Sequence, residues 1–454
     1  MKKRDKKNRS RHGSTSIFLA IIISALILVE CTFLAFVWNL DYALAVNTAL
    51  KTELDTILSD YNRQLFDCYG IYAFSIDDVD NYCFDKALEI NGLDSRSVLY
   101  TTASYKITTE DLRKAISSYY WYRGSGVAVN TVIDDYGSFI KELDKTGIID
   151  KISQYMQSPA SGYVSQIIEG SESTEEWVKK AGELLNADDL IEQIDEIDTI
   201  RSTFSDVLHD SDIGLDVDIT NWEGILDTLS KLEKVVDGAS DASGNNVLSK
   251  LNISHYCAYN FDCAKPPVDD ASINGTPFKS IHGDKKADCE YLITGLDETA
   301  AVLLTGMNVA HVLILANLLK DYANEQIRNT VEVIAEVISV IISAVSEGSV
   351  NIDSKWIALG LMLYVAMVQS IKDVYHVNKG EKVTIFEYDG VKMITFDYRD
   401  FLYLFCLCTP EEKLLERSLE ILERDYGDLY KGISLEADFR GNEFTAEKSY
   451  QLYE

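Results

Sequence analysis

The longest continuous hydrophobic run lies near the N-terminus, from Ile17 to Trp38 (IFLAIIISALILVECTFLAFVW), and contains one charged residue, Glu30. At about 1.5 Å per residue, a helix of this length spans about 33 Å, which matches the hydrocarbon core of a bilayer. The run is longer than the apolar core of a signal peptide, and no A-x-A-like cleavage site follows it. We therefore predict one transmembrane helix over residues 14–38.

Hydrophobic positions continue at helical spacing beyond this run, with no Pro or Gly before Gly70. They recur at three-, four- and seven-residue intervals as Leu40, Leu44, Leu54, Leu58, Tyr61 and Leu65. This stripe predicts one helix from Ser14 to about Phe66, about 80 Å long, whose second half docks against an outer domain. Residues 39–75 would then be an amphipathic stalk helix and a turn, with Tyr69–Phe74 leading into a strand.

The pattern over residues 76–454 predicts a mainly α fold with a small β element (α+β). A helical insertion is expected at about 110–250, and the core is expected after Asp297, where apolar helices crowd together. Two β-rich runs around Asp389-Gly390 predict a β-hairpin near 382–396, because Asp-Gly favours a type I′ turn. Three further apolar stretches are each too short or too polar for a span, so we expect buried helices at Ala300–Leu319, Val331–Val345 and Trp356–Val368.

Charge is divided unevenly along the chain and predicts its topology. The net charge is −31, yet residues 1–13 hold seven Lys or Arg and one Asp. By the positive-inside rule, residues 1–13 form a basic cytoplasmic tail and residues 76–454 an acidic extracytoplasmic domain. Trp38 would anchor the outer membrane interface. The acidic surface repels nucleic acid and anionic lipid headgroups, so we expect no nucleic acid as a partner. The lipid bilayer is expected as a partner because of the apolar segment Ile17–Trp38.

Glu30 is the unusual residue of the membrane segment. A carboxylate within hydrocarbon costs a few kcal/mol, so it is expected to find a partner or to be protonated. One interpretation is a helix–helix contact, through which the chain would form an oligomer or join an assembly. The other is neutralisation without any role.

The motifs of common enzymes are missing, so the residues by themselves support neither an enzymatic function nor a cofactor. The sequence contains no G-x-S-x-G, Walker A or G-x-G-x-x-G motif. Metal-ligand residue types occur at spacings that match no zinc pattern, namely His255, Cys257, Cys263, His282 and Cys289. The Asp-rich segment Asp210–Asp218 lacks the spacing of an EF-hand, so a solvated loop is favoured over a Ca²⁺ site.

The cysteines allow two interpretations. Cys31 lies in the membrane segment, which leaves seven cysteines elsewhere. In an oxidising compartment, the candidate disulfides are Cys257 with Cys263 and Cys68 with Cys83. Alternatively, these residues are small buried hydrophobes.

Several segments in order along the chain resemble one family. They are GSTSIFLA (Gly13–Ala20), DYNRQLFDCYGIYAF (Asp60–Phe74), EYLITG (Glu290–Gly295), SIKDVYHVNKGEKV (Ser370–Val383), DYRDFLYLF (Asp397–Phe405) and EKLLERSLEILERDY (Glu412–Tyr426). The chain resembles TadE/TadG-like proteins, which are exported accessory proteins of tight-adherence (Flp-type) pilus systems, and in particular their large-domain branch in Gram-positive bacteria. The likeness covers about half the chain, at both ends.

The resemblance implies a non-enzymatic, minor-pilin-like or assembly-associated role, with other pilus or export-machinery proteins as partners. It also points to Gly13 and Ser14 as a candidate processing site. Pilin-type precursors carry a Glu five residues after the processing Gly, where this chain has Phe18, so we favour an uncleaved anchor. The alternative functions are an extracytoplasmic sensor or ligand-binding domain on a signal anchor, and a membrane-tethered cell-wall hydrolase.

Overall fold

The computed structural model describes residues 9–76, 82–93, 98–123, 137–139, 141–143, 145–169, 245–266, 286–345, 349–388, 392–439 and 441–451. They form two compact units, Met1–Asp111 with Glu423–Glu454, and Leu112–Leu422. The sequence predicts a single domain after residue 75. Strands near the C-terminus pair with a strand near the N-terminus, so segments from both ends of the chain belong to the first unit.

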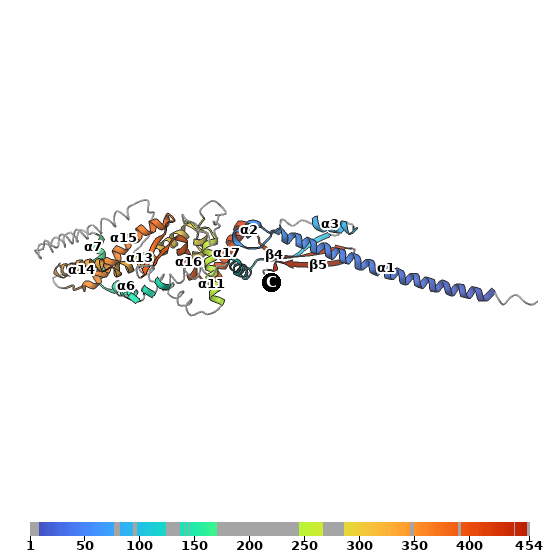
Figure 1. Ribbon diagram of the computed structural model, residues 1–454, viewed down its shortest axis with the longest axis horizontal. Coiled ribbons are helices and arrows are strands. Elements are labelled where there is room, and N and C mark those ends of the chain that lie inside the picture. The colour runs from blue at the N-terminus through green and yellow to red at the C-terminus, as the bar shows by residue number, and fades with distance from the viewer. Residues whose placement is uncertain are drawn as a thin grey trace, which may run out of the picture. The chain divides into compact units, whose positions relative to one another are not determined.

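The first unit is built on the long helix α1 (Arg9–Ser59). Every side chain from Ser16 to Asp41 is exposed, and burial begins beyond Tyr42. In the following turns Val46, Leu50 and Leu54 are at most 1% exposed. The predicted division of one helix into a free apolar half and a docked half is therefore present (Figure 1).

The docked part ends earlier than predicted. α1 stops at Ser59, and a separate short helix, α2 (Arg63–Tyr69), follows it. The Asn62 side chain accepts a hydrogen bond from Leu65 N at 2.9 Å, so Asn62 is the N-cap that starts the new helix. Gly70 closes α2 in the left-handed region with φ 68°, a conformation that glycine adopts at no steric cost. The single helix predicted to about Phe66 is therefore wrong beyond Ser59.

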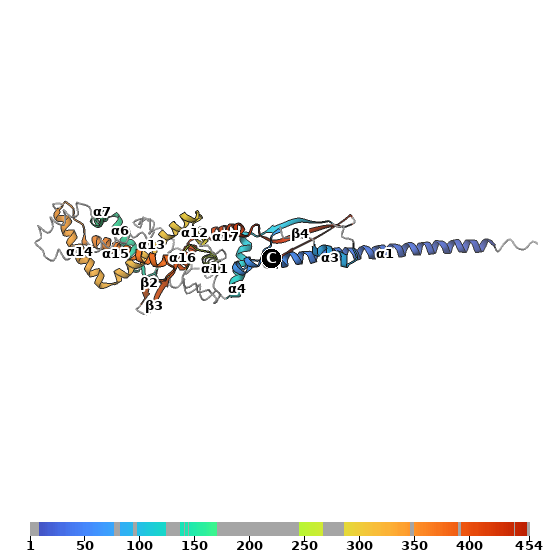
Figure 2. The ribbon, with the colours of Figure 1, turned by 90° about the horizontal axis from the view of Figure 1, so that it is seen from above.

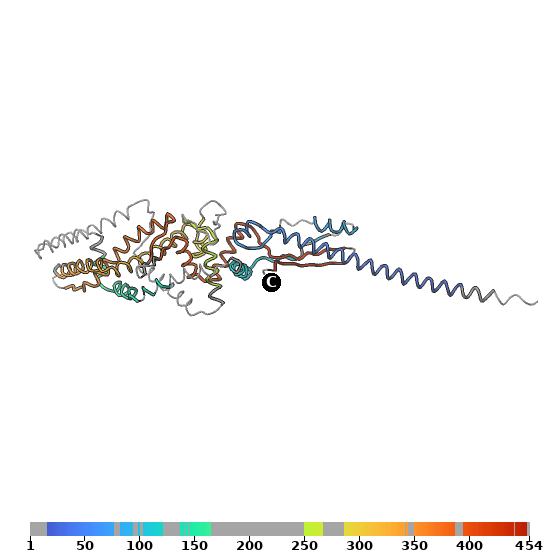
Figure 3. Tube along the Cα trace, in the orientation of Figure 1, coloured from blue at the N-terminus to red at the C-terminus, as the bar shows by residue number. Residues whose placement is uncertain are grey.

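A three-stranded antiparallel sheet covers the docked half of α1. Its order is β1 (Val98–Lys106), β4 (Tyr430–Phe439) and β5 (Asn442–Ser449), so segments from opposite ends of the chain pair directly. Figure 3 shows these blue and red segments running side by side. The core of the unit comprises Val46, Ala49, Leu50, Leu54, Ile57, Leu58, Phe74, Phe84, Leu88, Ile433, Leu435, Ala437 and Phe439.

A buried carboxylate attaches helix α3 (Tyr82–Ile90) to α1. Glu53, 1% exposed, accepts a hydrogen bond from Phe84 N at 2.6 Å through Oε2. An anion is favourable at this position because the first N–H groups of a helix lack intrahelical partners. α1 is thus fixed within its unit by polar as well as apolar contacts.

In its described residues, the second unit is helical apart from one hairpin. Its helices are α4 (Thr109–Arg123, from Leu112 onward), α6 (Ile148–Gln157), α7 (Ala160–Glu169), α11 (Asn245–Asn260), α12 (Asp288–Thr294), α13 (Glu298–Ala323), α14 (Glu325–Val345), α15 (Ser354–Asn378), α16 (Tyr398–Cys408) and α17 (Glu411–Tyr426, up to Leu422). The strands β2 (Val383–Tyr388) and β3 (Lys392–Phe396) pair antiparallel, with Val383 opposite Phe396. Figure 2 shows this hairpin beside α13 and α16. The mainly α class with a hairpin near 382–396 is confirmed.

The core of the second unit is formed by α13 and α15, which both pack against α14. Three helices in the described part of the chain are long and apolar enough to cross a membrane, namely α1, α13 and α15. The apolar windows of α13 and α15 are 67% and 78% buried inside the protein, whereas that of α1 is fully exposed. α13 and α15 are therefore core helices, as the sequence predicts. Residues 170–244 of the predicted helical insertion lie outside the described residues.

Candidate functional sites: the membrane helix, a surface pocket and a buried polar cluster

The exposed half of α1 presents an apolar surface on all sides. Its large side chains are strongly exposed, from Ile17 at 64% to Trp38 at 74%. Its few hydroxyls are satisfied within the helix, because Ser24 and Thr32 donate to the carbonyls of Ala20 and Leu28 at 2.8 and 2.7 Å. A helix without exposed backbone groups and with an apolar surface is suited to hydrocarbon.

The structure places the predicted contact residues on this free half. Glu30 and Trp38 are both exposed, and no hydrogen bond or ion pair of the Glu30 side chain occurs among the described residues. A partner for Glu30 would therefore have to come from outside this part of the chain. Gly13 and Ser14, the candidate processing site, lie within α1.

Neither candidate disulfide is formed. No disulfide joins the eight cysteines, of which Cys257 and Cys263 are buried and Cys68 and Cys83 partly exposed. Cys257 lies within α11, and its Sγ is 3.6 Å from the Ser418 hydroxyl. Burial raises the pKa of the Cys257 thiol to about 12, so it behaves as a small apolar side chain rather than a nucleophile.

The metal-ligand residue types do not converge. No group of three or more His, Cys, Asp or Glu residues in the described ranges could hold a metal ion. His255 instead bonds to the Tyr120 hydroxyl at 2.8 Å through Nδ1 and stacks on Tyr259. Its burial lowers the imidazole pKa to about 4, so the ring is neutral. His282 and Asp210–Asp218 lie outside the described residues.

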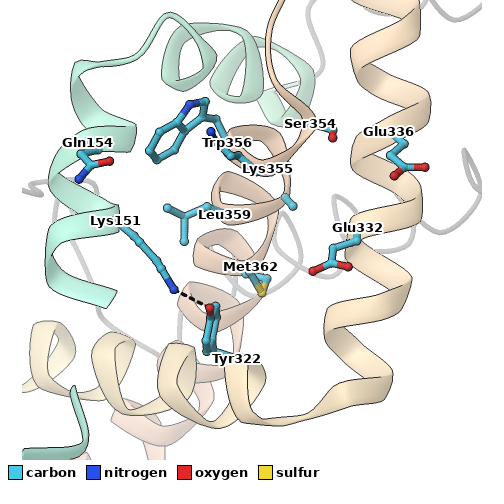
Figure 4. Close-up of a pocket in the computed structure, with 11 residues that line it drawn as sticks. Lys151, Gln154, Tyr322, Glu332, Glu336, Ser354, Lys355, Trp356, Leu359 and Met362 are labelled. Carbon is cyan, nitrogen blue, oxygen red and sulfur yellow. Dashed lines mark hydrogen bonds between the residues drawn. The ribbon is translucent and has the colours of Figure 1, made fainter. Parts of the chain in front are cut away.

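A surface pocket of about 520 Å³ lies among α6, α13, α14 and α15. Its wall on α6 carries Lys151, whose ammonium donates to the Tyr322 hydroxyl at 2.5 Å and lies 4.3 Å from the centre of that ring. In Figure 4, Glu332 and Glu336 project from α14 on the opposite side. The pocket therefore brings one cation and two carboxylates to facing walls.

The floor of the pocket is apolar and comes from α15. Leu359 and Met362 are each 4% exposed, and Trp356 stands above them near the rim (Figure 4). Lys355 adds a second ammonium, held at 2.8 Å from Asp353. An apolar floor, an indole and charges of both signs would suit a small zwitterionic molecule. The lining includes no His or Cys, the usual bases and nucleophiles of hydrolases.

A buried polar cluster was not predicted from the sequence. Glu290 in α12 is fully buried, and its Oε1 accepts hydrogen bonds from Ala264 N at 3.0 Å and from the Tyr398 hydroxyl at 2.9 Å. Next to Ala264, Lys265 donates from Nζ to Asn378 Oδ1 at 2.5 Å. Burial raises the pKa of Glu290 and lowers the pKa of Lys265. Sequence spacing could not reveal this cluster, because its members come from four distant segments.

Comparison with known proteins adds no assignment. Neither the family models, nor the curated proteins, nor the solved structures contain a match to this chain. Function therefore has to be argued from the geometry and from the resemblance of the individual segments.

Proposed function

We propose that the chain is a non-enzymatic, membrane-anchored component of a Tad/Flp-type pilus or a related surface-export apparatus, minor-pilin-like or assembly-associated. The observation that carries the proposal is the division of α1 into an apolar half, exposed from Ser16 to Asp41, and an outer half packed under the sheet β1–β4–β5. Such a helix can lie in the bilayer and pack laterally on other helices, while the sheet holds its outer half rigidly.

The charge pattern and the segment resemblance support the same role. The basic residues before the span favour a cytoplasmic N-terminus and a domain outside the cell. Glu30 would be the polar contact to a neighbouring helix, since a carboxylate in hydrocarbon is favourable only with a partner or a proton. The TadE/TadG-like segments include Asp60–Phe74, which joins the end of α1 to the sheet.

Photo-crosslinking in living cells of the source bacterium tests the proposal. A photoreactive amino acid replaces Leu26 or Leu34 in the exposed half of α1, and Leu50 in the docked half serves as the matched control. We expect Leu26 and Leu34 to yield crosslinks to membrane proteins of the pilus machinery or to other pilin-like subunits. Leu50 should yield crosslinks only within the chain.

Mass analysis of the extracted N-terminus accompanies this experiment. A chain that starts at Ser14 would show processing after Gly13 and would overturn the uncleaved anchor. Crosslinks from Leu26 and Leu34 to lipid alone would contradict the apparatus role.

A second function is favoured by the pocket of Figure 4. A sensor or ligand-binding domain on a signal anchor requires a concave site with convergent polar groups, and the facing charges of Lys151 and Glu332 above an apolar floor meet that requirement. If crosslinking finds no apparatus protein, ligand binding at this pocket becomes the better proposal.

A further inference from the structure

The side chains of Lys265 and Asn378 are close enough to react with each other. Lys265 follows α11 and Asn378 ends α15, 113 residues further along the chain, and Lys265 Nζ is 2.5 Å from Asn378 Oδ1. The amide carbon Cγ is bonded directly to that oxygen. Reacting atoms held about 3–3.5 Å apart in fixed orientation behave as an intramolecular pair with a large rate advantage.

Burial acts against the charged form of the Lys265 amine. The Lys265 ammonium is partly buried and lies 5.7 Å from the centre of the Tyr398 ring, and that ring is fully buried. Desolvation lowers the pKa of Lys265, which raises the fraction of the nucleophilic NH₂ form.

A buried carboxyl group, that of Glu290, interacts with Lys265. Burial raises the pKa of the Glu290 carboxyl group, which increases the fraction of its protonated form. Its Oε1 is held by Ala264 N and the Tyr398 hydroxyl, whereas Oε2 is buried and has no hydrogen-bond partner among the described residues. An unpartnered buried carboxyl oxygen carries a desolvation cost that a purely structural role does not explain.

We propose that Lys265 and Asn378 become joined by an intramolecular isopeptide bond, which the protein forms itself with Glu290 as the proton-transfer group. The neutral Nζ of Lys265 attacks Cγ of Asn378 and forms the new C–N bond, while Glu290 protonates Oδ1. The resulting carboxylate takes a proton from Nζ and passes it to Nδ2. The Cγ–Nδ2 bond then breaks, ammonia leaves, and the proton on Oδ1 returns to Glu290. The reaction consumes no oxidant or reductant, and the carboxyl group ends as it began.

A second Lys–Asn pair in the same unit also has a lysine pKa lowered by burial, with the buried carboxyl of Asp321 next to it, but it differs in its hydrogen bonding and serves as the control. Lys320 Nζ is 3.1 Å from Asn317 Oδ1, on the same helix, and it also donates to the Thr384 carbonyl. The Asn317 amide nitrogen donates to Ser370 and Asp373, which holds it in place as an amide. We expect no bond at this pair.

The product would tie the segment after α11 to the end of α15. These two segments meet only in the folded unit, so the bond can form only after folding. Its chemistry is the same whether the chain serves in a pilus or as a sensor.

Peptide mass spectrometry of the full-length chain, extracted from membranes in detergent and then denatured, tests the proposal. Trypsin releases Leu251–Lys279, since Pro266 blocks cleavage after Lys265, and separately Asp373–Lys379. We expect one branched peptide that is about 17 Da lighter than the sum of the two, which corresponds to the loss of ammonia when a lysine amine acylates.

Four variants separate the chemistry from a structural contribution. The branched peptide should be present in Lys320→Met and absent in Lys265→Met and Asn378→Ala. In Glu290→Gln the amide oxygen still accepts from Ala264 N and Tyr398, so the fold is retained, as circular dichroism will check. A pulse-chase should nevertheless show that bond formation slows by about 10²-fold or more, because proton transfer is lost.

Two results would overturn the proposal. Separate, unmodified peptides from the folded wild-type chain would show that the bond does not form. A branched peptide that appears at the wild-type rate in folded Glu290→Gln would exclude Glu290 as the proton-transfer group.

Discussion

Two arginines each donate hydrogen bonds to the carbonyls at the C-terminus of a helix. Because one is more buried than the other, we expect them to contribute differently to the free energy of unfolding. Arg399, 6% exposed, donates from Nη1 to the carbonyls of Ala258, Tyr259 and Phe261 at 2.9, 3.2 and 3.3 Å, at the C-terminus of α11. A cation is favourable there, because the last carbonyls of a helix have no intrahelical partner.

Arg417 makes the matched arrangement nearer to water. Its Nη1 donates to the carbonyls of Leu292 and Ile293 at 2.7 and 3.0 Å, at the C-terminus of α12, and the side chain is partly exposed. We compare Arg399→Met with Arg417→Met, since methionine keeps an unbranched side chain and removes only the donors.

The expected loss in the free energy of unfolding depends on whether water can reach the carbonyls that lose their arginine hydrogen bonds. In Arg399→Met the carbonyls stay buried without a charged donor, which costs about 1.5–3 kcal/mol for the shortest bond and less for the two longer ones. The apolar replacement offsets part of this cost, so we expect a net loss of about 3 kcal/mol. In Arg417→Met water can reach the freed carbonyls, and the expected loss is about 1 kcal/mol or less.

Hydrogen exchange of the amides of α11 for Arg399→Met, and of α12 for Arg417→Met, measures each loss locally, and urea unfolding of the same samples measures it globally. A loss of about 3 kcal/mol corresponds to roughly 100-fold faster exchange through opening of this segment, against less than about tenfold for Arg417→Met. If Arg399→Met exchanges no faster than Arg417→Met, then burial does not set the value of these bonds and the reasoning is wrong.

Two further predictions concern the same unit. At Gly360 a Cβ would lie 2.6 Å from the Tyr155 hydroxyl, so Gly360→Ala should lower the free energy of unfolding in urea by about 1–3 kcal/mol. At Gly306 a Cβ would meet open space, so Gly306→Ala should raise the free energy of unfolding by about 0.5–1 kcal/mol. Equal effects of the two substitutions would refute the packing argument. His311 is buried, neither ring nitrogen has a partner among the described residues, and burial lowers its pKa to about 4. As the pH falls, the unfolded chain therefore takes up a proton at this histidine before the folded chain does. Between pH 6.5 and 4 the free energy of unfolding of the wild type should fall by about 2–3 kcal/mol through this histidine, and His311→Leu should not show that loss. Urea midpoints that fall equally in both proteins between pH 7 and 4.5 would contradict this.

The local pattern of residues is sufficient to predict the elements that depend on local interactions. The apolar run ending at Trp38, the helical spacing that follows it and the Asp389-Gly390 hairpin signal each act within a few residues, where periodicity and turn chemistry decide the conformation. The break after Ser59 could not be predicted from periodicity, because an apolar stripe continues across it and the capping role of Asn62 becomes visible only with its bond to Leu65.

The tertiary structure alone decided the features that require distant segments to meet. β1 pairs with β4 from the other end of the chain, and Lys151 meets Tyr322 at the pocket wall. Lys265 meets Asn378 across 113 residues, next to Glu290. Charged and polar side chains at these positions look like ordinary surface residues in the sequence, because no local periodicity records which surfaces will come together. The sequence by itself determined the long apolar N-terminal helix and the mainly helical class, and the packing within each unit determined which polar groups are brought together and buried.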